Sequence, residues 1–330
     1  MALSASLWLT GCRNPVKQTG QNSSIKVTDF RGVEVALEKP ATRIVCLIES
    51  ALSGLYMLHA ESKVIGVPAN IYSESVYDQY AALDERIKYK KIPAPGNWDF
   101  VNLESVVALQ PDLVIIWSSQ KESIEAIEER GIAVYGVFLQ SLSDVYKEIT
   151  DLGRLTGKQP RADSLLTYTQ HEIARLKTLT RSLSNDRSVY FMWSQGLLET
   201  SGTSSTVNEL IELAGAKNVC RSAHEHMVVN MESVLEWNPD VIIMWYNAAR
   251  LPSDVINIPE WRNISAVRNE QVYQLPSVFL CDLWTLKFQY AAKLLASWCY
   301  PDSFKGFDIE KEKNNMLLNL YGQKGLKLSE

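Results

Sequence analysis

Two tryptophans occupy equivalent points of a repeated segment. Residues 102–117 align without a gap on residues 230–245, and eight of the sixteen positions are identical. Each copy predicts a helix, a Pro-Asp stop, a buried strand and then Trp117 or Trp245, because proline cannot continue a helix and disfavours helical backbone at the residue before it. Ligands of open parallel sheets lie off the carboxyl ends of the strands, so we expect both indoles to face one cleft. Indoles there suit a large planar or amphipathic ligand.

The same repeat aligns two acidic residues, Glu104 and Glu232, near the start of each predicted helix. Negative charge in the first turn is favoured by the helix dipole, which is one explanation of both residues. An exposed carboxylate can also form a bidentate contact with a guanidinium group. Both roles are compatible in one side chain.

Two histidines, His224 and His226, form a His-x-His pair. In an extended segment alternate side chains share one face, so both rings could reach the same metal ion. The alternative is that each imidazole is an ordinary surface or hydrogen-bonded group. We carry both residues as candidate metal ligands.

The cysteines fall into two groups. Cys12 ends an apolar, charge-free stretch that closes with Leu-Thr-Gly-Cys, which resembles the lipidation site of an exported lipoprotein, and the polar segment after it resembles a tether. This predicts a lipid anchor on Cys12 and a signal and tether over residues 1–24. The remaining cysteines have no CxxC or zinc spacing, and their disulfide state is open: Cys46, Cys220, Cys281 and Cys299.

Length and composition favour two globular domains. The chain has 330 residues, 46% of them hydrophobic and 22% charged, which is ordinary for folded protein but long for one core. The formal net charge of −5 gives no electrostatic basis for a nucleic-acid partner. We expect a monomer with no permanently bound cofactor.

Short β-branched runs alternate with helical patterns along the chain, which predicts parallel sheets covered on both faces. A helical pattern of more than twenty residues separates two such halves. The predicted strands are 43–48, 64–67, 113–117, 133–137, 188–193, 241–245 and 271–275, and the predicted helices are 51–59, 103–109, 121–130, 142–155, 160–183, 207–214, 231–237, 261–265 and 286–298. The predicted domains are an α/β lobe over 25–158, a connecting helix over 159–186 and a second α/β lobe over 187–330.

Several stretches resemble one family. They are Val27-Thr28-Asp29 ahead of the 43–48 strand, Asn102-Leu103-Glu104 with Gln110-Pro111-Asp112, and Ile258-Pro259-Glu260-Trp261 with Gln271-Val272-Tyr273. Over residues 27–322 the sequence resembles the class III periplasmic binding proteins of ABC importers, which take iron siderophores, haem and vitamin B12. The resemblance implies two Rossmann-like lobes joined by one long helix with limited hinge motion.

The resemblance also implies roles for particular residues. Glu104 and Glu232 match the glutamates that dock onto arginines of the permease dimer, whose ATPase subunits supply the energy. An aromatic six residues before each docking glutamate lines the vitamin B12 pocket in the family. Here those positions hold Trp98 and His226, and the histidine departs from the pattern.

Other predicted ligand-binding residues follow strands in the sequence, and these are Tyr72, Trp193, Arg250 and Trp284. The predicted function is a solute-binding lipoprotein that captures a metal chelate, such as a ferric siderophore or cobalamin. Haem, a nickel-histidine complex and molybdate or tungstate remain alternatives. An enzyme or a metal-cluster scaffold on a nitrogenase-like fold is the rival class, but no nucleophile elbow, dinucleotide loop, phosphate loop or suitable cysteine set is present.

Overall fold

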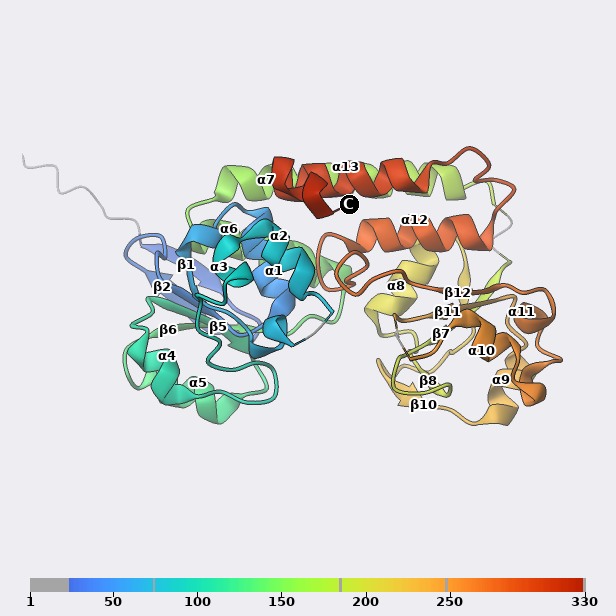
Figure 1. Cartoon of the computed structure of the whole chain (residues 1–330), viewed down its shortest axis with the longest axis horizontal. Helices are drawn as coiled ribbons and strands as arrows, with labels where there is room; N and C mark the ends of the chain where they lie inside the picture. Colours follow the sequence, from blue (N-terminus) through green and yellow to red (C-terminus); the bar gives the residue numbers. More distant parts are fainter. Residues whose placement is uncertain (1–23, 74, 184–185, 247–248, 329–330) are drawn as a thin grey trace, which may run out of the picture.

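The computed structural model describes residues 24–73, 75–183, 186–246 and 249–328. Two α/β lobes lie side by side, and one long helix, α7 (Gln159–Thr180), runs along the top of both in Figure 1. Each lobe contains a four-stranded parallel sheet, with strand order β4-β3-β5-β6 in the first lobe and β12-β11-β7-β9 in the second. The predicted fold class is therefore confirmed.

The first lobe begins with an antiparallel pair and continues as alternating strands and helices. Its central strands consist of β-branched and other apolar residues that are almost wholly buried, as expected for a sheet covered on both faces. The strands are β1 (Ile25–Thr28), β2 (Glu34–Leu37), β3 (Ile44–Cys46), β4 (Val64–Gly66), β5 (Leu113–Trp117) and β6 (Ala133–Val137). The helices are α1 (Glu49–Met57), η1 (Glu61–Lys63), η2 (Ala69–Tyr72), α2 (Tyr77–Leu83), α3 (Glu85–Lys88), α4 (Leu103–Ala108), α5 (Lys121–Glu128) and α6 (Leu142–Leu155).

The second lobe repeats the alternation of strands and helices, with shorter strands. A small antiparallel pair, β8 with β10, lies beside its parallel sheet. The strands are β7 (Ser188–Met192), β8 (Glu199–Thr200), β9 (Lys217–Asn218), β10 (Met227–Val228), β11 (Val241–Met244) and β12 (Val272–Gln274). The helices are α8 (Thr206–Leu213), α9 (Met231–Trp237), α10 (Pro252–Ile256), η3 (Pro259–Trp261), α11 (Ser265–Arg268), α12 (Phe288–Cys299), α13 (Ile309–Tyr321) and η4 (Gly322–Leu328).

The sequence repeat is also a structural repeat. Helix α4 leads into β5 and helix α9 leads into β11. Both helices are capped by an asparagine side chain, which accepts a hydrogen bond from the backbone amide of the third helical residue. Gln110 and Asn238, which precede the two prolines, both take left-handed backbone with φ of 48° and 42°. Both residues therefore avoid the right-handed helical conformation, as expected before proline. Their backbone is left-handed and not extended.

The repeated aspartates explain why the Pro-Asp pair occurs in both lobes. Asp112 accepts hydrogen bonds from the backbone amides of Thr42 and Arg43, which precede the neighbouring strand β3. Asp240 accepts one from the amide of Ser188 at the start of β7. Each carboxylate therefore ties the start of one parallel strand to the start of the next.

The structure differs from the predicted helices in two places. A single helix over 261–265 does not form, because Pro259 begins a short 3₁₀ turn and Ile264 then takes extended backbone (ψ 133°) before α11 starts. Helix α13 was not predicted, and its position explains much of the architecture. It lies along α7 and reaches from the second lobe back over the first, as Figure 1 shows.

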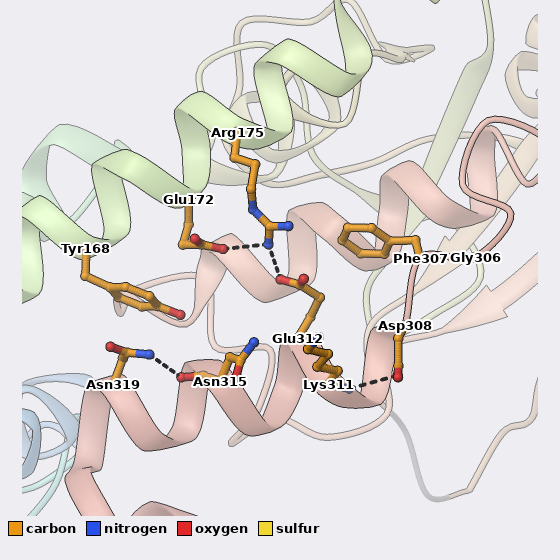
Figure 2. A pocket seen from close by; sticks show the side chains of 10 residues that line it. All are labelled: Tyr168, Glu172, Arg175, Gly306, Phe307, Asp308, Lys311, Glu312, Asn315 and Asn319. Atoms are coloured by element: carbon orange, nitrogen blue, oxygen red, sulfur yellow. Dashed lines mark hydrogen bonds and ion pairs between the residues drawn. The ribbon is translucent and has the colours of Figure 1, made fainter.

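A buried ion cluster fastens α13 and α12 to the connecting helix. Lys293 of α12 is 2% exposed, and its ammonium group contacts both Glu172 of α7 and Glu312 of α13, the latter at 2.6 Å. Arg175 of α7 also pairs with both carboxylates, and Figure 2 shows its contacts beside a cavity of about 570 Å³ between α7 and α13. Burial raises the pKa of Glu172, but hydrogen bonds from Lys293 and Arg175 outweigh it and leave that pKa below its ordinary value.

The two lobes also contact each other directly. The Tyr80 ring of the first lobe meets the Phe279 ring of the second edge to face at a centroid distance of 5.4 Å. Tyr321, at the end of α13, stacks on Phe279 and shares a 2.7 Å hydrogen bond with Ser53 of α1. Because these buried contacts join both lobes and the C-terminal helix, large hinge opening would expose apolar surface.

Replacing Lys293 by methionine should destabilise the protein by about 3 kcal/mol, because two largely buried carboxylates lose a shared cation. Urea unfolding at neutral pH measures this loss. The matched change Lys305→Met removes an exposed ion pair with Asp302 and should leave the unfolding midpoint unchanged.

The pH dependence of the Lys293→Met effect has a defined sign. The pKa of Glu172 is lowered in the folded state, so its contribution is present above the unfolded pKa and disappears as pH falls through the folded value. The difference between wild type and variant should shrink in that acidic window. A difference that grows on acidification would contradict the assigned ion cluster.

Candidate functional site

The two repeated tryptophans lie at the carboxyl ends of equivalent strands but differ in exposure. Trp117 is the last residue of β5, is partly exposed, and lines the space between the lobes. Trp245 directly follows β11 and is 8% exposed, so its ring belongs mainly to the wall behind that space. Both tryptophans therefore lie at the carboxyl ends of strands, as predicted. Trp117 lines the space between the lobes, whereas Trp245 does not.

Two adjoining cavities form a groove between the lobes. One has a volume of about 170 Å³ and the other about 360 Å³, and both are lined by Trp98, Trp117 and Trp284. Trp98 and Trp117 come from the first lobe, whereas Trp284 comes from the loop that joins β12 to α12 in the second. The larger cavity is within the range of small-molecule sites. We call these two cavities together the groove.

Loop geometry explains how Trp98 reaches the groove. Asn97 accepts hydrogen bonds from the backbone amides of Asp99 and Phe100, which forms a tight turn around Trp98. Gly96 lies only 2.5 Å, measured from an ideal Cβ, from the carbonyl oxygen of Phe100, so a side chain at Gly96 would clash with this turn. The indole of Trp98 is consequently left 62% exposed over the groove.

An aromatic stack continues from the groove into the second lobe. The ring of Trp193 lies parallel to that of Trp284, with a centroid distance of 6.2 Å and an interplanar angle of 8°. Trp193 also stacks on His226, with a centroid distance of 5.9 Å and an interplanar angle of 13°. The Trp193 indole nitrogen donates to Ser201 at 2.8 Å, and Trp245 packs against both tryptophans. The stack therefore holds Trp284 in a fixed orientation.

The two histidines have separate partners. His226 Nε2 lies 2.6 Å from a carboxylate oxygen of Glu199, while His224 Nδ1 lies 2.8 Å from the hydroxyl of Ser222. Within the part of the chain that the structure describes, no three His, Cys, Asp or Glu side chains are grouped as a metal site would need. His226 is linked to the groove only indirectly, because it stacks on Trp193, which in turn stacks on the lining residue Trp284.

Two predicted wall residues lie apart from the lining of the groove. The hydroxyl of Tyr72 donates to the carbonyl of Ile92, and burial raises the pKa of this tyrosine. The carbonyl of Arg250 accepts a hydrogen bond from the side chain of Gln274. Neither is among the residues that line the two cavities. Cys12 lies outside the described residues, and the four other cysteines are buried with free thiols.

The groove also contains polar residues that sequence reasoning missed. The lining of the smaller cavity includes Glu49, Ser50, Asn70 and Asp282, and that of the larger cavity includes Glu225. Glu49 and Ser50 follow strand β3, so the strand-end rule could have found them. Asp282 lies in a loop with no sequence signal.

Two buried carboxyl groups, those of Asp282 and Glu148, have raised pKa values. Asp282 is 2% exposed, and burial raises its pKa although Lys287, whose ammonium lies 4.0 Å away, opposes that rise. Burial, together with the charges of Asp282 and Asp151, raises the pKa of Glu148 in α6 to about 8. Glu148 is therefore largely protonated at neutral pH.

The two predicted docking glutamates occupy matching positions on the outside of the lobes. Glu104 is in the first turn of α4 and Glu232 in the first turn of α9, and both side chains are exposed. In Figure 1 these helices lie toward the lower edge of each lobe, on the side away from α7 and α13. The repeat thus places one acid on each lobe, at the same edge of the molecule.

A family model described as periplasmic binding protein matches residues 44–279. The chain belongs to this family. The predicted membership of class III is confirmed by its relatives, and since they are solute-binding proteins, this periplasmic binding protein is a binder and not an enzyme. Within the described residues, the helices are too short or too polar for any of them to cross a bilayer.

Two curated relatives extend over nearly the whole periplasmic binding protein. It is 28% identical to YvrC of Bacillus subtilis (strain 168), an uncharacterized ABC transporter substrate-binding lipoprotein, over 92% of this chain and 96% of that protein. It is 25% identical to the molybdate-binding protein MolA of Haemophilus influenzae, over 89% of this chain and 90% of MolA.

Solved structures of the family share the fold. MolA bound to molybdate superposes with a TM-score of 0.77 at 23% identity, covering 90% of this chain and 97% of MolA. A periplasmic solute-binding protein from Veillonella parvula superposes with a TM-score of 0.76 at 24% identity, covering 90% and 92% of the two chains. These likenesses confirm two lobes joined by a long helix.

The tryptophans of the periplasmic binding protein should separate into two groups on substitution. Trp193→Ala should cost about 3 kcal/mol of unfolding free energy, because this residue is 9% exposed and stacks on both Trp284 and His226. Trp98→Ala should change stability by less than about 0.5 kcal/mol, since its ring is mostly exposed. Chemical denaturation monitored by circular dichroism measures both. A large loss for Trp98→Ala would mean that this residue has a packing role.

Proposed function

We propose that this protein is the solute-binding component of an ABC importer that captures a metal chelate, of the ferric siderophore or cobalamin class, and delivers it to the permease. The observation that carries the proposal is the groove between the lobes, whose walls are the indoles of Trp98, Trp117 and Trp284. Trp98 and Phe138 are both exposed and line the same cavity, so their apolar surface is available to a ligand there. The organic shell of a chelate offers the flat apolar area that such rings bind.

The groove is largely preformed. Helix α7, the neighbouring helix α13 and the contact of Tyr80 with Phe279 hold the lobes together. Affinity then comes from a cleft that needs little reorganisation, and not from wide closure around the ligand. Trp193, Trp245 and His226 support the groove through the aromatic stack, whereas Tyr72 and Arg250 lie apart from its lining.

Docking onto the permease uses Glu104 and Glu232. Both carboxylates are exposed and lie in the first turns of equivalent helices, α4 and α9, which are at the same edge of the molecule in Figure 1. Arginines on a twofold permease dimer would meet one glutamate from each lobe through bidentate contacts. The lipid on Cys12 would keep the protein at the membrane surface, in the periplasm or outside the cell, as a monomer that meets the permease with its ATPase subunits.

Protein purified without stripping should retain its ligand, which native mass spectrometry detects as a mass increment and absorbance detects as a metal-centred band. The increment should contain one metal ion and its organic chelator. A bare oxyanion in the groove, with no organic component, would contradict the chelate assignment and favour the molybdate class.

Reversing both docking charges, Glu104→Arg with Glu232→Arg, should abolish uptake while ligand affinity stays within about twofold, since both residues lie outside the groove. Uptake in cells and tryptophan fluorescence titration measure the two effects. The matched double change Glu85→Arg with Glu260→Arg alters net charge equally at other exposed helix starts and should preserve uptake. Loss of ligand binding in the docking variant would refute the assigned role.

A further inference from the structure

One loop of the second lobe forms part of the groove and is itself largely buried. Residues 275–287 join β12 to α12, and this loop carries the lining residues Asp282 and Trp284. Phe279 and Lys287, which lie in the same loop, are both 0% exposed. Loops usually run over the surface of a protein, so a buried loop depends on its side chains for a fixed position.

Lys287 ends this loop as a buried cation. Its ammonium nitrogen lies 3.8 Å from the centre of the Phe279 ring and 4.0 Å from a carboxylate oxygen of Asp282. Burial by itself lowers the pKa of Lys287. Electrostatic interactions with Tyr321, Asp282 and Glu49 outweigh burial and leave that pKa above its ordinary value. The side chain is therefore charged at neutral pH, and an aromatic face stabilises it where water is excluded.

The groups around this ammonium come from both lobes. Asp282 belongs to the same loop and Tyr321 to the end of α13, whereas Glu49 is the first residue of α1 in the first lobe. Glu49 also accepts a 2.6 Å hydrogen bond from the hydroxyl of Tyr80 in α2. One buried cation thus lies among residues of the loop, α13 and α1, which are far apart in the sequence.

Two of these carboxyl groups belong to the lining of the smaller cavity. Glu49 lines it from the first lobe and Asp282 from the second, whereas the fully buried Lys287 is not among the lining residues. Two carboxyl groups are costly to bring together away from water, and a cation shared between them offsets that cost. Lys287 therefore favours the arrangement in which the two walls are close.

This interaction is separate from the ion cluster around Lys293. Lys293 lies inside α12 and pairs with carboxylates of α7 and α13, the helices that run along both lobes. Lys287 lies at the start of α12, next to residues that line the groove. A buried cation is stabilised only while its partners keep their geometry, so each lysine restrains the elements around it. Lys293 restrains the long helices, and Lys287 restrains the walls of the groove.

We propose that Lys287 is a positioning residue of the groove, whose buried ammonium holds the loop that carries Trp284 against Glu49 of the first lobe. It sets the width of the groove, and through that width the affinity for the chelate, without contact with the ligand. The effect on affinity rests on the proposed function, whereas the effect on width does not.

The width can be measured without any ligand. Spin labels on cysteines introduced at Glu122 of α5 and Glu236 of α9 report the separation of the lobes by pulsed electron paramagnetic resonance. Both positions are exposed, and their helices lie in different lobes on the side away from α7 in Figure 1. A Cys12→Ser background is used, and the four other cysteines are buried.

Lys287→Met removes the charge and keeps an unbranched side chain. The otherwise unchanged protein should give one narrow distribution of distances between the labels. The Lys287→Met variant should give a broader distribution that extends to longer distances, because nothing then offsets the carboxyl groups of the two walls.

The same variant should bind a chelate more weakly. The probes are the ferric complex of a linear trihydroxamate and cyanocobalamin, each titrated by tryptophan fluorescence. For a probe that the wild type binds, Lys287→Met should raise the dissociation constant about tenfold, because the site is no longer preformed.

Leu210→Ala is the matched control for lost stability. Leu210 of α8 is 0% exposed and is not among the residues that line the groove. Its truncation should lower the unfolding midpoint, but the distance distribution should stay narrow and the affinity should stay within about twofold.

Two further variants separate charge from packing. Asp282→Asn combined with Lys287→Met removes both charges of the loop, and it should narrow the distribution again relative to Lys287→Met alone. If Lys287 only filled space, the two changes would add. Glu49→Gln keeps an acceptor for Tyr80 and removes the charged partner in the first lobe, so it should also broaden the distribution, and it serves if Lys287→Met does not fold.

The outcomes are distinct. Unchanged distances in both Lys287→Met and Glu49→Gln overturn the positioning role, and so does an equal change in Leu210→Ala. Altered distances with unchanged affinity overturn the link between width and binding. If the wild type binds neither probe, the proposed function is contradicted, and the distances still decide the role of Lys287.

Discussion

The fixed distance between the lobes is the constraint on which the rest of the structure depends. It is set by α7 and α13, which are clamped together by the ammonium of Lys293 between Glu172 and Glu312. A buried cation shared by two carboxylates is stable only when all three groups keep their geometry, so the clamp resists sliding of one helix past the other. The lobes are then close enough for Tyr80 and Phe279 to meet below the groove.

The repeated helix and strand units explain the shared architecture of the two lobes but not the groove between them. Asp112 and Asp240 make the same ties between neighbouring strands, and Glu104 and Glu232 begin the same helices. The tryptophans that follow the repeated strands have diverged in use, because Trp245 is covered by Trp193 and Trp284 while Trp117 stays open to the cleft. A symmetric scaffold thus carries an asymmetric site.

The polarity of the site follows from how that asymmetry is built. The second lobe contributes its aromatic stack and the loop with Asp282, whereas the first lobe contributes the start of α1 with Glu49 and Ser50. Lys287 neutralises part of the buried charge without reaching the groove, and Glu148 is kept protonated by burial. Burial raises the pKa values of both Asp282 and Glu148, and Lys287 opposes the rise at Asp282.

The sequence by itself determined the fold class, the long connecting helix and the equivalence of the two halves. These features depend on local patterns: apolar strands, proline stops and a repeat that can be read without knowing any contact. Trp117 and Trp284 were also within reach, since the rule that ligands lie at strand ends applies to loops after strands, whereas Trp98 came from the family resemblance. The wrong helix over 261–265 shows the limit of such patterns, where a 3₁₀ turn at Pro259 replaced helical spacing.

Only the tertiary structure decided the rest. Helix α13 has a weak apolar pattern because part of what it buries is charge, and Glu312 finds its partners on α7 and α12, which are distant in sequence. Asp282 became part of the groove because a loop of the second lobe reaches the start of α1 in the first. Contacts of this kind depend on how two lobes meet in space, and no local spacing of residues encodes that meeting.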